Sequence, residues 1–268
     1  MPRNTKTPTT RKKAQDVPLL KITVQVWKRV ADRLDTTLRD AAFRRDAYLA
    51  KVIENELDWL DSEVSIPNSE AAQSFVTREI GRLPRKAVTL RLPQTVVERL
   101  AEICQSKRIV RDAFFNRLFL LLAANPKNID QLLFEGYGSE DGDWRADLWR
   151  HHKNETDAFF VNGLFPLRAA HDPLWAIRLG LEIWNERSGA NEKWLEPSSG
   201  REILITRTLG GAPKPIASVY ASPFMVRFKN HPDIGLLGLS CYLPDHLVPE
   251  TEAAVHEVAA VEELLASL

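Results

Sequence analysis

An internal repeat constrains the fold of this chain more than any other feature of its sequence. Residues 21–53 align with residues 87–119 at a constant offset of 66 without a gap, and seven of the 33 aligned pairs are identical. Charged, apolar and small positions all agree, so a shared helical periodicity alone is a poor explanation of the match. The identical pairs are Thr23/Thr89, Val30/Val96, Arg33/Arg99, Leu34/Leu100, Arg45/Arg111, Asp46/Asp112 and Ala47/Ala113.

Each repeat predicts one strand followed by two helices. Residues 21–26 and residues 87–92 alternate polar and apolar side chains, which is typical of a strand with one buried face. Pro93 ends the second strand and suits the first turn of a helix. Apolar residues then recur at helical spacing: Val30, Leu34 and Leu38 are matched by Val96, Leu100 and Cys104, and Tyr48, Leu49, Val52 and Ile53 by Phe114, Phe115, Leu118 and Phe119.

One such unit cannot be stable alone. Its strand has two unpaired edges, and the apolar faces of its helices have nothing to cover them. We therefore expect the two strands to pair antiparallel and the four helices to share one core. The connector, residues 61–85, contains Pro67 and Gly81 and is long enough to carry the chain back. The fold class that this predicts is α+β, with repeats at 21–60 and 86–124 forming an N-terminal unit over residues 19–124.

The second half of the chain, residues 125–268, differs from the first in its pattern of apolar and charged residues and is expected to form a separate α+β domain. Residues 135–147 are acidic and Gly-rich, which favours a loop, and residues 173–184 have helical spacing. Strand-like runs follow at 203–205, 219–228 and 236–243, and residues 250–268 have the composition of a helix. Five of the seven tryptophans lie in this half, where a structural core is a better explanation than a ligand pocket.

The net charge of zero hides an asymmetry between the two halves. Residues 1–124 carry 23 Lys and Arg against 15 Asp and Glu, whereas residues 125–268 carry 13 against 21. A basic half joined to an acidic half suggests a polyanion partner for the first half, although two solvated surfaces of opposite sign would look the same. Residues 1–18 have the composition of a disordered basic arm, in which Arg11, Lys12 and Lys13 could follow a phosphate backbone.

The sequence contains no pattern that predicts catalysis or metal binding. All six histidines follow residue 150, and His171 is followed by Asp172, which is a good cap for the helix expected after it. Cys104 and Cys241 fall on apolar stretches and are expected to be inert buried thiols. We therefore expect a protein that is not an enzyme and needs no cofactor or metal. Without an apolar run long enough to span a membrane, or a signal peptide, we expect it in the reducing cytoplasm, associated with the nucleoid.

The strand-helix-helix repeat resembles the ribbon-helix-helix superfamily, the family of MetJ and Arc, which place a two-stranded β-ribbon in the major groove of DNA. Lys21 to Val24 is similar to the MetJ strand, and Thr89 to Pro93 to the general pattern of a strand that ends in arginine, an apolar residue and proline. Two repeats in one chain resemble the TraY-like conjugation proteins, in which a fused pair replaces the homodimer. The resemblance covers about 100 of the 268 residues.

The resemblance implies two sets of DNA-binding residues. The base-reading residues of the family are the outward strand positions, which here are Lys21, Thr23, Gln25, Thr89 and Arg91, with Ala87 at the remaining position. The family also binds phosphates with the N-terminus of the second helix. Here those segments carry Asp46 and Asp112, which would repel a phosphate, so we expect side chains to supply the backbone contacts: Arg44, Arg45, Lys107, Arg108 and Arg111.

These features predict a sequence-specific protein that binds double-stranded DNA, with a transcriptional repressor or autoregulator as the leading hypothesis. An accessory protein of plasmid or mobile-element transfer would need the same ribbon. A third hypothesis is an enzymatic or toxin-like C-terminal module that the repeats target to DNA. We expect the C-terminal half to self-associate or to bind a protein partner. Because the two strands differ in sequence, the DNA subsite is predicted to be asymmetric.

Overall fold

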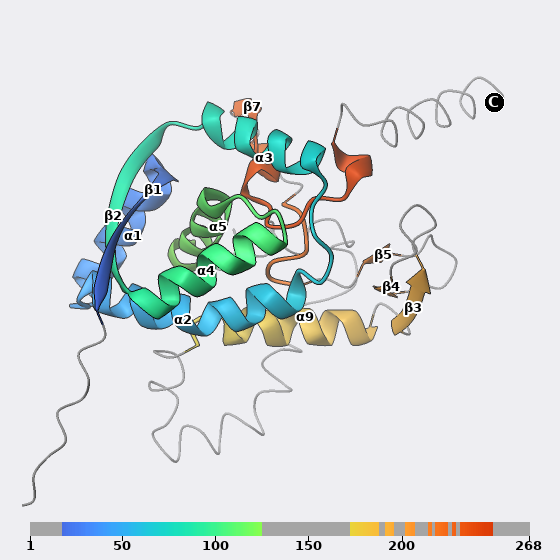
Figure 1. Ribbon diagram of the computed structural model, residues 1–268, viewed down its shortest axis with the longest axis horizontal. Coiled ribbons are helices and arrows are strands. Elements are labelled where there is room, and N and C mark those ends of the chain that lie inside the picture. Colours follow the sequence, from blue (N-terminus) through green and yellow to red (C-terminus); the bar gives the residue numbers. More distant parts are fainter. Residues whose placement is uncertain are drawn as a thin grey trace, which may run out of the picture.

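The computed structural model describes residues 18–124, 172–187, 191–195, 202–206, 214–215, 218–224, 227–228 and 231–248. The chain is an α+β protein in which a two-stranded antiparallel sheet packs against several helices (Figure 1). Residues 1–17 of the basic arm, the acidic loop at 135–147 and the helix expected at 250–268 lie outside the described residues. No helix within the described ranges is long and apolar enough to cross a membrane.

The two-stranded sheet, called the ribbon below, joins segments from the two repeats. Strand β1 (Leu19–Trp27) pairs antiparallel with β2 (Arg85–Pro93), as the sequence predicts. Each strand extends beyond the predicted range, because the antiparallel pairing continues to Leu19 opposite Pro93 at one end and to Trp27 opposite Arg85 at the other. The inward positions, Val24, Val26, Leu90 and Leu92, have no solvent exposure. Their burial explains why the register of the ribbon is firmly set, since a slip by one residue would turn them all outward.

Two helices follow each strand, at matching positions. In the first repeat these are α1 (Lys28–Asp40) and α2 (Arg45–Glu63), and in the second α4 (Gln94–Ser106) and α5 (Arg111–Ala123). The backbone contacts repeat at the same offset of 66 as the sequence. The amide of Lys28 donates to Pro84 O at 2.7 Å, and that of Gln94 donates to Pro18 O at 2.9 Å. The structural repeat therefore reaches back to residue 18.

The turns between the paired helices are also alike. Ala42 and Arg108, which are 66 residues apart, are the two described non-glycine residues with a positive φ, of 57° and 50°. Each follows the last turn of its helix, where a left-handed residue lets the chain leave the helix axis. The next amides then donate to equivalent carbonyls, Phe43 N to Leu38 O and Ile109 N to Cys104 O, both at 2.9 Å.

The connector contains a helix that the sequence analysis does not predict. Helix α3 (Glu70–Arg82) begins after Ser69, whose side chain accepts a hydrogen bond from the amide of Ala72. Its buried face, Ala72, Phe75, Val76 and Ile80, packs on the 3-10 helix η2 (Leu236–Leu239) and on α5. Contact with η2 is close enough that a Cβ at Gly238 would lie 2.7 Å from the Cβ of Glu79.

The described C-terminal elements follow the expected pattern only in part. Helix α9 (Trp175–Arg187) and strand β4 (Glu202–Thr206) form where helix and strand are predicted, and β4 pairs with β3 (Asn191–Leu195) and β5 (Lys214–Pro215). The strands expected at 219–228 and 236–243 are wrong. Residues 219–221 form a turn, residues 227–228 are a two-residue strand β6 that pairs with β7 (His231–Gly235), and η2 and η3 (Asp245–Leu247) follow.

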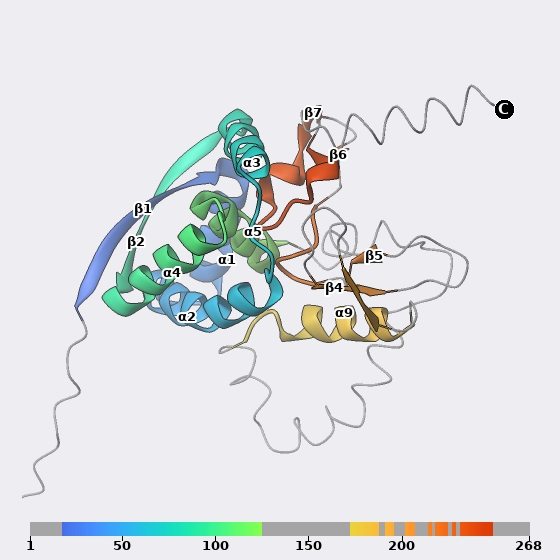
Figure 2. The ribbon, with the colours of Figure 1, turned by 45° about the vertical axis from the view of Figure 1, so that its right-hand side comes forward.

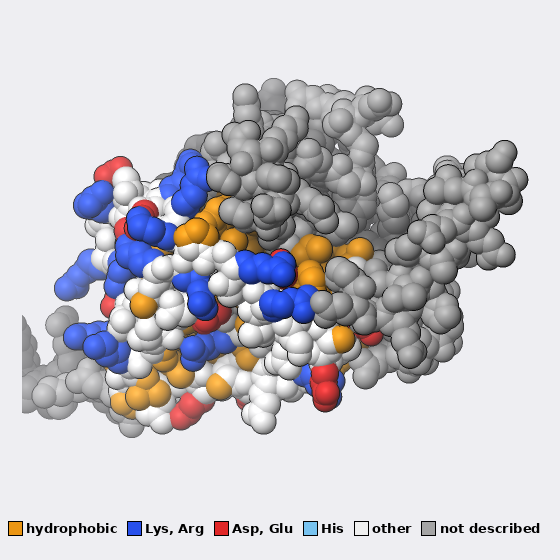
Figure 3. All heavy atoms as spheres, turned by 90° about the horizontal axis from the view of Figure 1, so that it is seen from above, with side chains coloured by type: hydrophobic (Ala, Val, Ile, Leu, Met, Phe, Trp, Pro, Cys, Tyr) orange, Lys and Arg blue, Asp and Glu red, His pale blue; other side chains and the backbone are white. Residues whose placement is uncertain are grey.

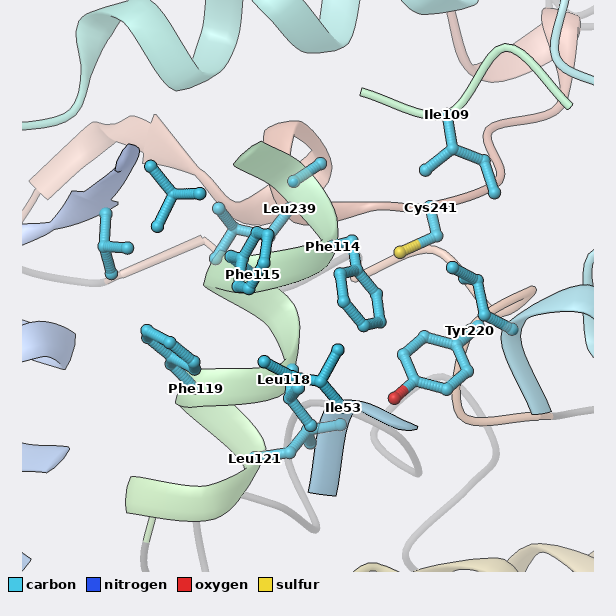
Figure 4. Close-up of a cluster of buried hydrophobic side chains, with 14 of the residues drawn as sticks. Ile53, Ile109, Phe114, Phe115, Leu118, Phe119, Leu121, Tyr220, Leu239 and Cys241 are labelled. Atoms are coloured by element: carbon cyan, nitrogen blue, oxygen red, sulfur yellow. The ribbon is translucent and has the colours of Figure 1, made fainter. Parts of the chain in front are cut away.

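The reason for this difference is visible in the packing. Apolar side chains of residues 219–224 and 236–243 pack into the hydrophobic core of the repeats, and these segments do not form a sheet of their own. Tyr220, Phe224 and Cys241 are fully buried, and Tyr220 lies 5.8 Å from Phe114 of α5 between ring centroids. Figure 4 shows Phe114 directed at Tyr220 and Cys241, with Phe119 one to two turns along the same helix. The described C-terminal segments and the repeats thus share one hydrophobic core.

Candidate nucleic-acid interface

The structure brings the five candidate base-reading residues together on the outward face of the ribbon. In the register of the sheet, Lys21 lies opposite Arg91, Thr23 opposite Thr89, and Gln25 opposite Ala87. Opposed residues of an antiparallel pair point to the same side, and the Oγ1 atoms of Thr23 and Thr89 lie 3.3 Å apart. Lys21, Thr23 and Arg91 are exposed, whereas Gln25 and Thr89 are half-buried.

The register places a local two-fold axis at the centre of this face. Thr23 and Thr89 are equivalent in the repeat and are also directly opposite each other. A rotation about this axis places each position of β1 on the equivalent position of β2, as in a symmetric homodimer. The helices that pack on the ribbon come from both repeats, with α5 against β1 and α2 against β2. The ribbon lies at one end of the molecule, and α9 and the sheet of β3, β4 and β5 lie toward the other (Figures 1 and 2).

Two arginines tie the second helix of each repeat to the ribbon centre. Arg45 donates from Nη2 to Thr89 O at 3.0 Å, and its equivalent Arg111 donates to Thr23 O at 3.1 Å. Each arginine thus reaches the central threonine of the other repeat's strand. These two candidates for phosphate binding lie beside the outward face, and each uses one terminal nitrogen to hold the ribbon backbone.

The charges around the two arginines differ. Arg45 forms ion pairs with Asp46 at 3.0 Å and Asp35 at 3.5 Å, and although burial lowers the pKa of Arg45, these carboxylates raise it overall. Arg111 is half exposed, and its nearest described carboxylate, Asp112, lies 3.8 Å away. Arg111 is therefore less neutralised by neighbouring carboxylates than Arg45, which favours Arg111 as a contact for an anionic ligand.

Lys86, which the sequence analysis does not name as a candidate, neutralises two carboxylates of α1 in the first repeat. Lys86 binds Asp32 at 2.9 Å and Asp35 at 3.1 Å. Hydrogen bonds from Lys28 and Lys86 lower the pKa of Asp32, while the two carboxylates raise the pKa of Lys86. The repeat equivalent of Lys86 is Leu20, which has no charge, so the two flanks of the ribbon differ in their electrostatics.

The remaining candidates for backbone contact are spread more widely. Arg44 is exposed and directly precedes α2. Lys107 is directed into the protein, where it donates to Asp61 O and to Val64 O and pairs with the Asp61 carboxylate at 2.7 Å. Arg108 donates to Asn68 O at 3.2 Å. The structure therefore does not bring Lys107 and Arg108 to the ribbon centre; Arg11, Lys12 and Lys13 lie outside the described residues.

Arg85 is a further exposed residue of the outward face that the sequence analysis missed. It lies at the start of β2, an even number of residues from Ala87, Thr89 and Arg91, and therefore on their side of the strand. The signal was present in the sequence, because the alternation continues from Ala87 back to Arg85. Figure 3 shows Lys and Arg side chains gathered over the part of the surface that includes the ribbon end of the molecule, with few acidic ones among them.

The comparisons with known proteins yield one match. Residues 19–137 match the model of a family described as maintenance of carboxysome distribution protein B. This similarity spans both repeats, the connector and a short stretch beyond, which is less than half of the chain. No curated protein and no solved structure matches.

Proposed function

We propose that this chain is a non-enzymatic, sequence-specific protein that binds double-stranded DNA. In this proposal residues 19–124 are a fused pair of ribbon-helix-helix repeats, which lay β1 and β2 in the major groove. The observation that supports it most is the outward face of the ribbon. Three register pairs present polar or small side chains around a local two-fold axis, while the opposite face is buried under helices of both repeats.

The side chains on this face have the chemistry that base reading needs. The major groove admits a two-stranded ribbon and presents a distinct pattern of donors and acceptors for each base pair. Arg91 can pair bidentately with guanine, and Gln25 with adenine, each worth about 1–3 kcal/mol of discrimination. Lys21 suits guanine acceptors, and the threonines suit a thymine methyl or a polar edge.

The proposed subsite is asymmetric. A homodimer would present the same residues twice, whereas here Lys21, Thr23 and Gln25 stand against Arg91, Thr89 and Ala87. Arg85 lengthens the face on the second strand, and its repeat equivalent is the exposed Leu19. Arg85 and Arg91 are six residues apart, about 20 Å along a strand. They therefore contact different base pairs or flanking phosphates.

For phosphate contacts, the geometry favours Arg44 and Arg111 over the other described candidates. Both are exposed beside the N-terminus of a second helix, where helix dipoles favour anions. Arg45 and Lys107 have more of their donors engaged by the protein. One ribbon covers few base pairs, so tight binding should need a second copy or the basic arm.

The test is a binding profile on a library of random duplexes with the full chain. We expect Arg91→Ala and Gln25→Ala to relax the preference at one position each, whereas Arg111→Ala should weaken binding to all sequences and reduce the salt dependence. Arg99→Ala is the matched control, because Arg99 is an exposed arginine that pairs with Asp58 of α2. Wild-type protein that binds all duplexes equally, or none, would refute the proposal. A preferred site that is short and strictly palindromic would refute the asymmetry of the subsite.

The biological role that we favour is a transcriptional repressor or autoregulator. An accessory role in DNA transfer would use the same ribbon, and footprinting on the chain's own promoter and on a transfer origin distinguishes the two. An enzymatic C-terminal module that the repeats target would retain an activity when the ribbon face is mutated.

A second candidate function comes from the family match. The matched family is described by its part in the distribution of carboxysomes, and the match includes both repeats. In this candidate role the chain helps to position a cellular body. The two roles differ in cells: loss of a positioning protein mislocates labelled carboxysomes without changing transcript levels, whereas loss of a regulator changes transcripts from the genes that it binds.

A further inference from the structure

Two adjacent polar residues in the middle of α5 are buried without any solvent exposure. They are Asn116 and Arg117, and they stand between apolar neighbours on a helix that is otherwise a core element. Buried polar groups destabilise a fold unless their hydrogen bonds are made. The partners of these two side chains therefore indicate what α5 holds in place.

Asn116 holds one end of the ribbon. Its Oδ1 accepts a hydrogen bond from the amide of Trp27 at 2.7 Å, and its Nδ2 donates to the carbonyl of Gln25 at 2.9 Å. A second donation, to Asp112 O at 2.7 Å, fixes the amide group against its own helix. The backbone on both sides of Val26 is thus fastened to α5, at the end of β1 where Gln25 points outward.

Arg117 holds the C-terminal loop at residues 218–224. It donates from Nε to Val219 O and from Nη2 to Ser222 O at 2.7 Å, and its guanidinium lies over the ring of Phe224, 3.7 Å from the centroid. Burial lowers the pKa of Arg117 to about 10. Its partners are mainly neutral carbonyls and a ring, so this cation depends on the loop for its solvation.

The first repeat has no such arrangement. The equivalents of Asn116 and Arg117 are Ala50 and Lys51. Ala50 has no polar side chain, and Lys51 is exposed and pairs with Glu54 at 2.8 Å. The pair of buried polar residues that joins the Trp27 end of the ribbon to the loop is therefore present in one repeat only, where it breaks the local two-fold symmetry; α2 of the first repeat contacts the same loop through Glu56 and Glu63.

We propose that α5 couples the C-terminal loop to the Gln25 end of the ribbon, so that a ligand or partner that displaces the loop changes how this end reads DNA. The proposal rests on the proposed DNA-binding function. Neighbouring residues on a helix point in different directions, so one shift or rotation of α5 moves both sets of contacts together. Since a packed core has few intermediate arrangements, displacement of residues 218–224 cannot be absorbed at Arg117 alone.

Amide hydrogen exchange in the full chain tests the coupling without DNA. We would measure the exchange rate of the Trp27 amide relative to amides at the opposite end of the same ribbon, residues 19–21 and 91–92. Phe224→Leu removes the ring beneath the guanidinium without altering α5, and Arg117→Met removes both hydrogen bonds. Lys51→Met is the matched control in the first repeat.

We expect both loop-side variants to raise this ratio at least threefold, and Lys51→Met to leave it unchanged. A ratio that stays at the wild-type value in the folded Phe224→Leu protein overturns the proposal, whether or not Arg117→Met folds. A uniform rise at both ends of the ribbon indicates general destabilisation and also overturns it.

DNA binding by the same variants then separates the two hypotheses. Phe224→Leu should weaken the preference for the base that Gln25 reads and keep the one that Arg91 reads. An unchanged preference at both positions contradicts the regulatory step. Failure of the wild-type chain to bind any duplex contradicts the DNA-binding function itself, while the exchange ratio still reports whether α5 couples the two segments.

Discussion

Removal of Glu56 is the perturbation whose effect follows most directly from the structure. This residue of α2 is fully buried, and its carboxylate accepts hydrogen bonds from both terminal nitrogens of Arg178 in α9, one of them at 3.2 Å. The hydroxyl of Tyr220 donates to it at 2.6 Å. In Glu56→Ala, a nearly buried guanidinium and a buried hydroxyl lose their common acceptor.

The expected cost is a large part of the stability of an ordinary domain. Removal of one partner of a buried ion pair costs about 3–5 kcal/mol. Arg178 keeps Asp172 at 2.9 Å and the ring of Trp59, which moves the expectation toward the lower end of that range. We therefore expect a loss of about 3–4 kcal/mol in the free energy of unfolding, and a smaller loss for Glu56→Gln, whose amide oxygen can still accept one bond.

Urea unfolding followed by tryptophan fluorescence measures this loss. Glu54→Ala is the control on the same helix, because its ion pair with Lys51 is exposed and should contribute less than about 1 kcal/mol. The double variant Glu56→Leu with Arg178→Met should be more stable than Glu56→Ala, because it leaves no unpaired charge behind. A loss below about 1 kcal/mol for Glu56→Ala would show that α9 is not held to the repeats by this pair.

Three further predictions concern the backbone, the thiols and one carboxyl group. Ala42→Gly should stabilise the chain by about 0.5–1 kcal/mol, since a left-handed Ala is strained by about 1–2 kcal/mol and Gly adds some unfolded-state entropy; a lowered urea midpoint would refute the strain. Burial raises the pKa of Cys104 and of Cys241 to about 12, so neither thiol should react with iodoacetamide at pH 8 until the chain unfolds, and rapid alkylation of native protein would contradict their burial. Burial also raises the pKa of Glu63 above 4.5, so the folded state binds this proton more tightly than the unfolded chain does, and stability falls as the pH rises from 4.5 through the folded-state pKa; Glu63→Gln should flatten that slope in pH-dependent urea melts, and an equal slope in both proteins would exclude Glu63 as its source.

The ribbon could be predicted from the sequence because two independent patterns agree on it. Alternation of side chains gives each strand one apolar face, and the repeat supplies a second strand with the same pattern. The antiparallel pairing of β1 with β2 confirms this prediction. Helix α3 is not predicted although Phe75, Val76 and Ile80 lie at helical spacing, because Pro67 before it and Gly81 in its last turn indicate a connector without regular structure.

The buried polar residues could not be predicted, because their environment is decided by tertiary contacts. Lys51 and Arg117 align as a conservative exchange between the repeats, yet one is exposed and the other has no exposure. Glu56 does lie on the apolar stripe of α2, three residues after Ile53 and four before Leu60, but the local sequence does not show that Arg178 and Tyr220 will pair with it there. Local periodicity identifies the apolar face of a helix, but it does not show which polar position another segment will cover.

The C-terminal segments cover the two repeats unequally, and this decides how the protein has to be tested. Ile109, in the turn before α5, is 3% exposed, whereas its equivalent Phe43 is 49% exposed and stacks on Tyr48. If the chain were cut after residue 124, Arg117 would lose its carbonyl acceptors and Phe114 its contact with Tyr220. The fragment would also expose the face of α3 that contacts η2. Weak DNA binding by such a fragment would therefore reflect a damaged core as much as a missing interface, and point substitutions on the outward face of the full chain are the sharper test of the ribbon.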